Sequence, residues 1–294
     1  MDIRILKYFL AIAKEENITR AAHTLHMSQP PLSRQMKELE EELGKKLFVR
    51  TNKKIILTED GRLLQKRAQE LVDLFEKLQS ELSSSNEELR GTIYIGQGET
   101  CGGNFLAELA TTLQKKHPFI QYKLYAGDAQ MVFDKLDKGL IDFGLLISPV
   151  NLQNYDFIQL PFQDVWGVLM RKDSELASRP FISCQDLWKK PLILSHQTLK
   201  HQEMMDWFQR ESDELNIVMT YDLLFNASLF VKQGFGYAIA LDQIIPTGLE
   251  SELCFRPLFP PLKADLFIAW KKQRTFSKVS EAFLALLEDK FGFH

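Results

Sequence analysis

Two adjacent prolines divide a helical stretch of this sequence, within the motif "SQPP" at residues 28–31. Proline lacks a backbone N–H, so it is tolerated in the first turn of a helix, where the N–H groups have no partner within the helix. One helix must therefore end before the motif, and a second must begin near Ser28. Ala21 and Ala22 are small enough to let the two helices cross closely. Residues 18–44 therefore predict a helix-turn-helix.

The second helix has an apolar face and a separate face suited to nucleic acid. At about 100° per residue, its apolar residues fall within one arc. They are Leu32, Met36, Leu39 and Leu43. The other face carries residue types whose side chains form hydrogen bonds with base edges and phosphates. Its residues are Ser28, Gln29, Pro30, Ser33, Arg34 and Lys37. They predict a DNA-binding surface, and the alternative is an ordinary solvated face.

The charge and the capping around this helix support the same interpretation. Residues 20–54 carry eight basic and four acidic side chains, although the whole chain has a formal net charge of −3. The acidic run 38–42 lies in the C-terminal half, so we expect only the first two turns to enter a groove. A serine at the N-cap normally accepts from the amides two and three residues on, which here are prolines. We therefore expect the Ser28 hydroxyl to be free for a phosphate.

A basic segment follows, "KKLFVRTNKKIILT", in which two short strand-like pieces flank "TNKK". This pattern predicts a β-hairpin wing, and Arg50, Lys53 and Lys54 would contact phosphates or the minor groove. The alternative is a solvated basic turn.

A longer helix comes next, and its apolar residues recur at intervals of 4, 3, 4, 3 and 4. They are Leu64, Ala68, Leu71, Phe75, Leu78 and Leu82. A heptad seam of this length favours a partner helix, and dimerisation is the better interpretation. The alternative is a long helix that packs on its own domain. "SSSNEELRG" then predicts a frayed helix end and a hinge.

The rest of the chain alternates strands and helices. Strands at "GTIYIG", "FIQYKLY" and "IDFGLLI" alternate with helices near 104–116 and 131–138, and a similar series follows from "PLILS" to "YAIAL" with helices near 201–212 and 227–232. Two βαβαβ units predict two largely parallel sheets, and "ADLFIAW" with a helix at 276–287 could return the chain to the first. We therefore expect two lobes with a cleft between them.

Composition points to no membrane or metal role. Apolar residues form no run of about 18, and the three cysteines have no metal-ligand spacing. The N-terminus lacks the uninterrupted apolar segment of a signal peptide. We expect a cytoplasmic protein without a metal or cofactor.

Taken in order, these motifs resemble the LysR-type transcriptional regulators over nearly the full length. The resemblance rests on "AAHTLHMSQPPLSRQMKELEEELGKKLFVRT", "LTEDG", "IDFGLLI" and "VKQGFGYAIAL". It implies a winged helix-turn-helix at 1–58, a linker and dimerisation helix with a hinge at 59–90, and an effector-binding domain at 91–294. That domain would resemble periplasmic solute-binding proteins, with lobe I at about 91–160 and 267–294 and lobe II at about 161–266.

The resemblance also implies partners and residues. The partners are double-stranded promoter DNA, a small-molecule effector, further copies of the chain as a dimer or tetramer, and RNA polymerase. At the wing, Arg50, Thr51, Lys53 and Lys54 match the DNA-contacting positions. Effector contacts would come from loops after the strands. Those residues are Thr100, Cys101, Asp128, Gln130, Ser148, Ser195, Thr198 and Asn226.

Such loops begin helices, whose free amides favour an anion, so a small carboxylate would fit. Glu99 and Asp128 add negative charge there, which leaves a neutral effector, a cationic effector or no effector as the alternatives. Other functions also remain open. Cys101 at a helix start could be a redox sensor, or it could act as an enzyme nucleophile with His196 or His201. No acid, metal or phosphate-loop motif accompanies these residues, so we do not expect an enzyme. A pure solute-binding protein would leave the first 90 residues unexplained.

Overall fold

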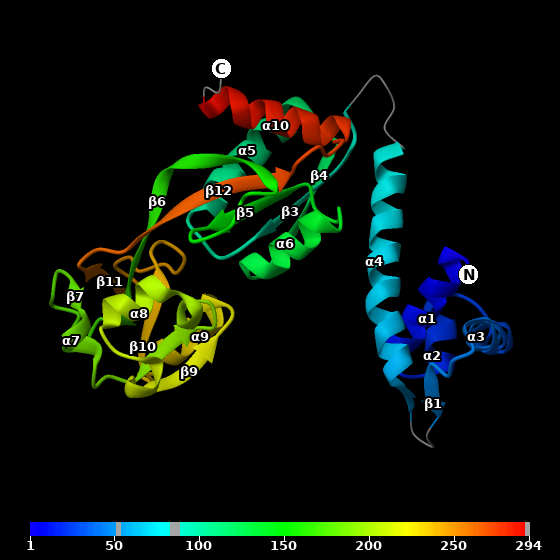
Figure 1. Cartoon of the computed structure of the whole chain (residues 1–294), viewed down its shortest axis with the longest axis horizontal. Helices are drawn as coiled ribbons and strands as arrows, with labels where there is room; N and C mark the ends of the chain where they lie inside the picture. The colour runs from blue at the N-terminus through cyan, green and yellow to red at the C-terminus, as the bar shows by residue number, and fades with distance from the viewer. Residues whose placement is uncertain (51–53, 83–88, 292–294) are drawn as a thin grey trace. The chain divides into compact units, whose positions relative to one another are not determined.

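The computed structural model describes residues 1–50, 54–82 and 89–291 (Figure 1). The chain divides into two compact units, Met1–Ser83 and Ser84–His294. None of the helices in the described part of the chain is long and apolar enough to cross a membrane.

The first unit packs short helices around one apolar core. Its elements are α1 (Ile3–Glu15), α2 (Ile18–Thr24), α3 (Gln29–Leu43), β1 (Phe48–Arg50), β2 (Ile55–Leu57) and α4 (Glu59–Leu82). Asp2 and Asn17 cap α1 and α2 by accepting from the amides of Arg4 and Arg20. Ala21 and Ala22 are buried where α2 meets α3, so their small size does permit a close crossing. The predicted helix-turn-helix is present, and β1 pairs antiparallel with β2 as its wing.

The motif "LTEDG" joins the wing to α4. The Thr58 hydroxyl donates to the carbonyl oxygen of Lys46 at 2.6 Å and accepts from the amide of Gly61 at 2.9 Å, so it caps the first turn of α4. A Cβ at Gly61 would lie 2.2 Å from the carbonyl oxygen of Leu47. Only glycine allows this close approach, and the motif therefore fixes α4 against the wing.

Glu40 connects the C-terminal half of α3 to the wing. Its carboxylate accepts from the amides of Leu47 at 2.7 Å and Phe48 at 3.3 Å, and from Lys46 Nζ at 3.0 Å. Burial opposes the charge, yet these hydrogen bonds lower the pKa of the Glu40 carboxyl below its usual value. One member of the acidic run therefore serves the fold and does not face a ligand.

The long helix α4 has two different apolar sides. Ala68 and Val72 are buried in the core of the first unit, and Leu64 packs against that core. Leu71, Leu74 and Leu78 are instead 47%, 44% and 48% exposed. The predicted single seam is therefore wrong for Leu64 and Ala68, because the helix needs them to cover its own domain. An exposed stripe at heptad spacing remains farther along, and the side chain of Leu82 lies outside the described residues.

The second unit contains two lobes joined by two long strands. The first lobe holds β3 (Gly91–Gln97), α5 (Gly102–Lys116), β4 (Ile120–Ala126), α6 (Ala129–Asp137), β5 (Phe143–Ile147) and α10 (Lys278–Phe291). Its strands run in the order β4-β3-β5, all parallel, followed by β12 (Lys263–Lys271) and β6 (Tyr155–Arg171), with β12 antiparallel to both of its neighbours. Helices α5 and α10 cover one face of this sheet and α6 covers the other (Figure 1).

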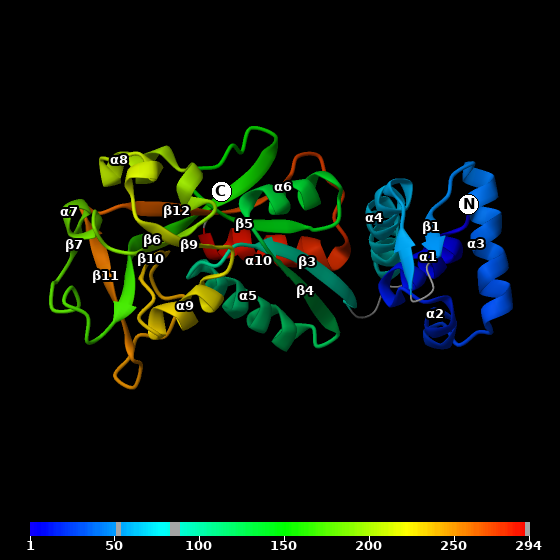
Figure 2. The same ribbon diagram turned by 90° about the horizontal axis from the view of Figure 1, so that it is seen from below.

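The second lobe repeats this arrangement with shorter helices. It holds β7 (Ile182–Ser183), α7 (Cys184–Leu187), β8 (Leu192–Ser195), α8 (Gln202–Phe208), β9 (Ile217–Tyr221), α9 (Leu224–Lys232), β10 (Tyr237–Leu241) and β11 (Leu253–Phe259). Strands β10, β8 and β9 are parallel, and β10 and β11 pair antiparallel with β6. Strand β6 therefore pairs with β12 along its first part and with second-lobe strands along its last part (Figure 2).

Several predicted boundaries shift, and the sheets are less parallel than expected. Helix α8 ends at Phe208, because Gln209 takes a left-handed backbone conformation with φ 55°. Helix α9 begins three residues before the predicted start, at Leu224. The largest difference is the 17-residue strand β6, which joins the two expected sheets into one 10-stranded sheet.

We expect Glu40→Ala to loosen the junction of α3 with the wing by about 1–3 kcal/mol at pH 7, because two amides lose their acceptor. The pKa of the Glu40 carboxyl is lowered in the folded chain. Its contribution to folding stability is therefore fully present above the unfolded pKa of about 4.3, and it is lost as the pH falls through the lower, folded pKa. Hydrogen exchange of α3 and β1 peptides in the full chain measures this loosening. Glu42→Ala, at an exposed position of the same helix, is the control. Equal protection in the two variants would contradict the role of Glu40.

Candidate DNA-binding helix and inter-lobe cleft

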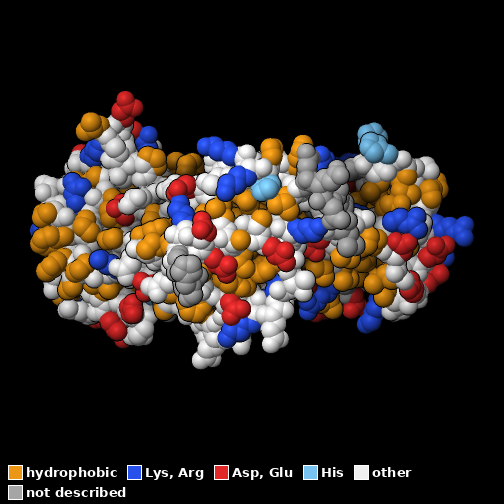
Figure 3. All heavy atoms as spheres, turned by 90° about the horizontal axis from the view of Figure 1, so that it is seen from above, with side chains coloured by type: hydrophobic (Ala, Val, Ile, Leu, Met, Phe, Trp, Pro, Cys, Tyr) orange, Lys and Arg blue, Asp and Glu red, His pale blue; other side chains and the backbone are white. Residues whose placement is uncertain are grey.

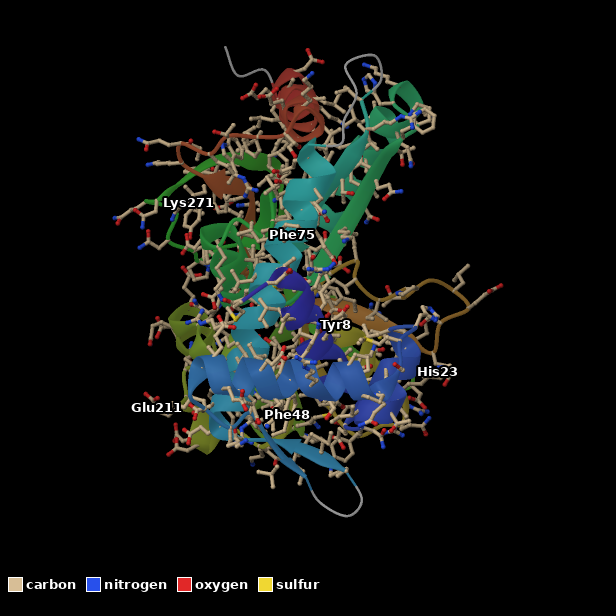
Figure 4. The ribbon with its side chains drawn as sticks, turned by 90° about the vertical axis from the view of Figure 1, so that its right-hand side faces the viewer. Tyr8, His23, Phe48, Phe75, Glu211 and Lys271 are labelled. Atoms are coloured by element: carbon tan, nitrogen blue, oxygen red, sulfur yellow. The ribbon has the colours of Figure 1, made fainter. Side chains whose placement is uncertain are left out.

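Helix α3 presents its N-terminal half to solvent. Leu32, Met36 and Leu39 are buried, which turns the opposite side outward. Ser28 is the N-cap of α3 and makes no capping hydrogen bond through its side chain, because prolines occupy the positions that would donate. Gln29 and Pro30 are exposed beside it. Figure 4 looks onto the solvent side of α3, with Tyr8 of α1 and Phe48 of β1 on either side of the helix.

The two basic residues of this face form ion pairs within the helix. Arg34 Nε lies 2.8 Å from Glu38 Oε1, and Lys37 Nζ lies 3.5 Å from Glu41 Oε1. Arg34 is 81% exposed and Lys37 is 75% exposed. Exposed pairs of this spacing contribute about 0.3–0.5 kcal/mol, so a phosphate or a guanine can replace the carboxylate at small cost. Ser33 lies half-buried on the same side.

The wing is described only in part. Strands β1 and β2 bring Arg50 and Lys54 to the two ends of the hairpin loop. Lys54 Nζ lies 3.0 Å from Glu16 Oε2, which ties the wing to the end of α1. Thr51, Lys53 and the side chain of Arg50 lie outside the described residues, so their predicted DNA contacts stay predictions.

A cavity of about 490 Å³ lies between the two lobes of the second unit. It is lined at the carboxyl ends of β3, β4 and β5 in the first lobe and of β8, β9 and β10 in the second. Its residues are Gly98, Glu99, Ala126, Gly127, Asp128, Ile147, Trp166, Ser195, His196, Gln197, His201, Tyr221, Asp222, Leu223, Leu224, Leu241 and Ile244. Open α/β sheets bind ligands at this edge, so the cavity is the candidate effector site.

The polar groups of the cleft are mainly acceptors. Glu99, Asp128 and Asp222 line it, and the described lining contains no lysine or arginine. Burial lowers the pKa of His201, which favours its uncharged form. Among the described residues, no group of three or more His, Cys, Asp or Glu side chains is arranged to hold a metal ion. The cleft therefore combines negative charge with apolar and aromatic walls.

Two of the eight predicted effector residues, Asp128 and Ser195, line the cavity. Thr198 is fully buried and bonds the Ser195 hydroxyl at 2.6 Å, so both hydroxyls hold the loop after β8. Ser148 Oγ accepts from the amide of Asp265 at 2.8 Å, which anchors the end of β5 to β12. Gln130 bonds Asp134 along the exposed side of α6, and Asn226 is exposed on α9 outside the lining.

Sequence reasoning missed several lining residues. Tyr221 is the last residue of β9 and Asp222 directly follows it, at the strand end where ligand contacts are expected. They were missed because the next helix was expected to begin later, which moved the prediction to Asn226. Trp166 belongs to β6, a strand that no sequence pattern indicated. Leu241 ends β10 and Ile244 lies three residues after it, but neither side chain is polar, so neither was singled out from the sequence.

Cys101 and Thr100 lie beside the cleft, outside its lining, and contact a buried carboxyl group. Thr100 Oγ1 donates to Asp164 Oδ2 at 2.5 Å, and Asp164 is 2% exposed. Burial, and after it the neighbouring Asp164 carboxyl, raises the pKa of the Cys101 thiol to about 12. A reactive cysteine needs the opposite shift. The position of Cys101 at a helix start therefore does not activate it.

Comparison with known proteins decides the family. Residues 3–62 match the sequence model of the "Bacterial regulatory helix-turn-helix protein, lysR family", and residues 86–292 match that of the "LysR substrate binding domain". The chain belongs to the LysR family. This LysR-family protein is a DNA-binding transcriptional regulator with a C-terminal effector-binding domain.

Relatives of this LysR-family regulator include proteins with different stated roles. The HTH-type transcriptional regulator BsdA of Bacillus subtilis (strain 168) is 33% identical over 260 residues, which cover 86% of this chain and 88% of BsdA. The dual regulator OxyR of Escherichia coli (strain K12) is 30% identical over 217 residues, covering 73% and 70%. Full-length CbnR, crystallised with its target DNA, has a TM-score of 0.78 at 19% identity, covering 98% of this chain and 99% of CbnR, and is similar in fold.

We expect Cys101 of this LysR-family regulator to react with iodoacetamide at pH 7.5 about a thousandfold more slowly than a free cysteine, whose pKa is about 8.5. The pKa near 12 leaves very little thiolate at that pH. Peptide mapping of the folded full chain measures the rate, and the same protein in urea is the control. Rapid labelling of Cys101 in the folded chain would restore the redox-sensor hypothesis.

Proposed function

We propose that this regulator reads promoter DNA with the N-terminal half of α3 and responds to a small molecule bound between the lobes of its second unit. The single observation that carries the first part is the exposed start of α3. There, Ser28 has no capping bond, Gln29 is exposed, and Arg34 is held only by an exposed glutamate. A groove can therefore receive these side chains without disturbing the buried side of the helix.

The free energies of the two contacts favour Arg34 leaving Glu38 for a DNA base when the protein binds. The exposed pair with Glu38 contributes about 0.3–0.5 kcal/mol. A bidentate contact from arginine to guanine discriminates against other bases by about 1–3 kcal/mol. Arg34 therefore loses little when it leaves Glu38 and gains sequence discrimination. Ser28 and Lys37 would contact phosphates, which position the helix without reading sequence.

The second element of the proposal is a dimer formed through α4. Leu71, Leu74 and Leu78 form an exposed stripe with spacings of three and four residues, the pattern that packs against a second identical helix. Figure 1 and Figure 4 both show α4 extending past α1, with Phe75 labelled on that part in Figure 4. A dimer would present two copies of α3 to two DNA half-sites.

Two other functions receive less support. The family consists of regulators, and Cys101 lies outside the cleft lining, so we infer no catalytic role for Cys101 with His196 or His201. Hydrogen peroxide-inducible gene activators are among the relatives, but the raised pKa of Cys101 opposes redox sensing through this residue. We infer that the protein works in the cytoplasm, where bacterial promoter DNA is found.

The DNA-binding proposal is tested by selecting sequences from a random duplex library with the purified full chain. We expect enrichment of two related half-sites. We expect Arg34→Ala to weaken binding to the selected sequence by about 1–3 kcal/mol and to relax preference at one base position of each half-site. Arg67→Ala, an exposed residue of α4 paired with Glu70, is the control for loss of charge. If Arg34→Ala kept affinity and preference, α3 would not be the reading helix.

The dimer proposal is tested by adding the same charge on two sides of α4. We expect Leu71→Glu to shift the protein toward monomers in sedimentation and to weaken operator binding at least tenfold, because a buried carboxylate would face the partner helix. Gln69→Glu places its charge on the other side of α4 and should leave both properties unchanged. A Leu71→Glu protein that stays dimeric would move the dimer contact elsewhere.

A further inference from the structure

We propose that the inter-lobe cleft selects small organic cations that carry a protonated amine. This inference rests on the proposed function of the cleft as the effector site and names the chemical class of the effector. A free carboxylate, which helix starts at strand ends would favour, is the class that the cleft disfavours.

Charge in the cleft is the first argument. Glu99 and Asp128 come from the first lobe and Asp222 from the second, so carboxylates face the cavity from both sides. The described lining has no lysine or arginine to balance them. His196 Nε2 lies 3.9 Å from Asp222 Oδ1, and both side chains are largely exposed to solvent. Figure 3 shows basic and acidic side chains interspersed over the face in view, whereas the carboxylates of the cleft lining have no lysine or arginine among them.

At three helix starts near the cleft, one first-turn amide already donates to a side chain. The amide of Leu224, the first of α9, donates to Glu99 Oε2 across the cleft. The amide of Met131 in the first turn of α6 donates to Asp128 Oδ1 at 2.8 Å. The amide of Gly102 at the start of α5 donates to Thr100 Oγ1 at 3.1 Å. An anionic ligand would have to displace a side chain to reach these three amides, and at the starts of α6 and α9 it would lie beside a carboxylate.

The walls of the cavity suit an organic ammonium group. Trp166 is partly exposed and Tyr221 is 8% exposed, and both line the cavity. The Tyr221 hydroxyl donates to the carbonyl oxygen of Ile239 at 2.8 Å, so that group is committed and the ring is what remains for a ligand. Aromatic faces attract ammonium and guanidinium groups. Leu241 and Ile244 add apolar surface for a carbon chain.

Carboxylates on both lobes also link binding to closure. The carboxylate of Glu99 in the first lobe already accepts a hydrogen bond from the start of α9 in the second lobe. A cation placed between Asp128 and Asp222 would be attracted to each lobe at once. Binding would therefore favour the arrangement in which the two lobes lie close together.

The test uses matched four-carbon probes and the full chain in isothermal titration at about 0.15 M salt, which keeps weak surface attraction screened. The probes are 1,4-diaminobutane, butylamine, agmatine, butane-1,4-diol and succinate. We expect at least one ammonium or guanidinium compound to bind at least tenfold more tightly than both the diol and succinate. Equal or tighter binding of succinate or the diol, or no binding by any of the cations, would overturn the proposal. So would binding of magnesium ion in their place.

Variants separate the cleft from general attraction to an acidic protein. Asp222 is 86% exposed, so Asp222→Asn should fold normally and weaken binding of the cation about fivefold or more. Glu99→Gln keeps an oxygen that can accept from Leu224 but removes the charge, and it should also weaken binding. Glu250→Gln, on an exposed loop outside the lining, is the control. Equal binding by all three variants would place the cation on the outer surface and overturn the proposal.

The two proposals fail separately. Titration without DNA reports only the cleft, and selection from random duplexes without a ligand reports only α3. A protein that selects DNA but binds no cation would overturn this inference alone. A protein that binds cations in the cleft but selects no sequence would overturn the proposed DNA reading alone.

Discussion

Every helix begins with amide groups that have no partner inside the helix, and the functional parts of this chain depend on how each start satisfies them. In helix α3, prolines occupy two first-turn positions and have no amide hydrogen to donate, so the Ser28 side chain makes no capping hydrogen bond. Helix α4 uses the Thr58 hydroxyl, and this same residue fixes the wing. Helices α6 and α9 use the carboxylates of Asp128 and Glu99. One constraint thus accounts for an exposed helix start in the first unit and for carboxylates that line the cleft in the second.

Much of the fold follows from sequence because its signals are local. The proline pair, the small residues at 21 and 22 and the alternation of strands and helices each act over a few residues. Features that depend on contacts between distant parts of the chain cannot be read from local sequence patterns. Leu64 and Ala68 share a heptad phase with Leu71, but only packing decides that they turn inward. Strand β6 was missed because its polar and apolar residues serve two different sheets and follow no single period.

The two candidate sites differ in the same way, because one lies on a single helix and the other is assembled from many strand ends. The exposed face of α3 could be predicted because one helix carries its residues, so spacing alone puts them on one side, while their contacts with DNA stay a prediction. The cleft assembles from six strand ends and β6, and an error of three residues at the start of α9 was enough to miss Tyr221 and Asp222. Glu99 could be flagged as unusual from sequence, but its bond to Leu224 spans 125 positions and becomes visible only in three dimensions.

Glu40 bonds the start of the wing to α3, and Gly61 lets the start of α4 approach the same segment closely. Under the proposed function, the offset between the groove that receives α3 and the backbone beside the wing strands would be set by the protein. A duplex that does not match this offset would have to bend or change its groove width, and the energy of doing so depends on how stiff its base steps are. Such a regulator would discriminate among sequences at base pairs that none of its side chains touches.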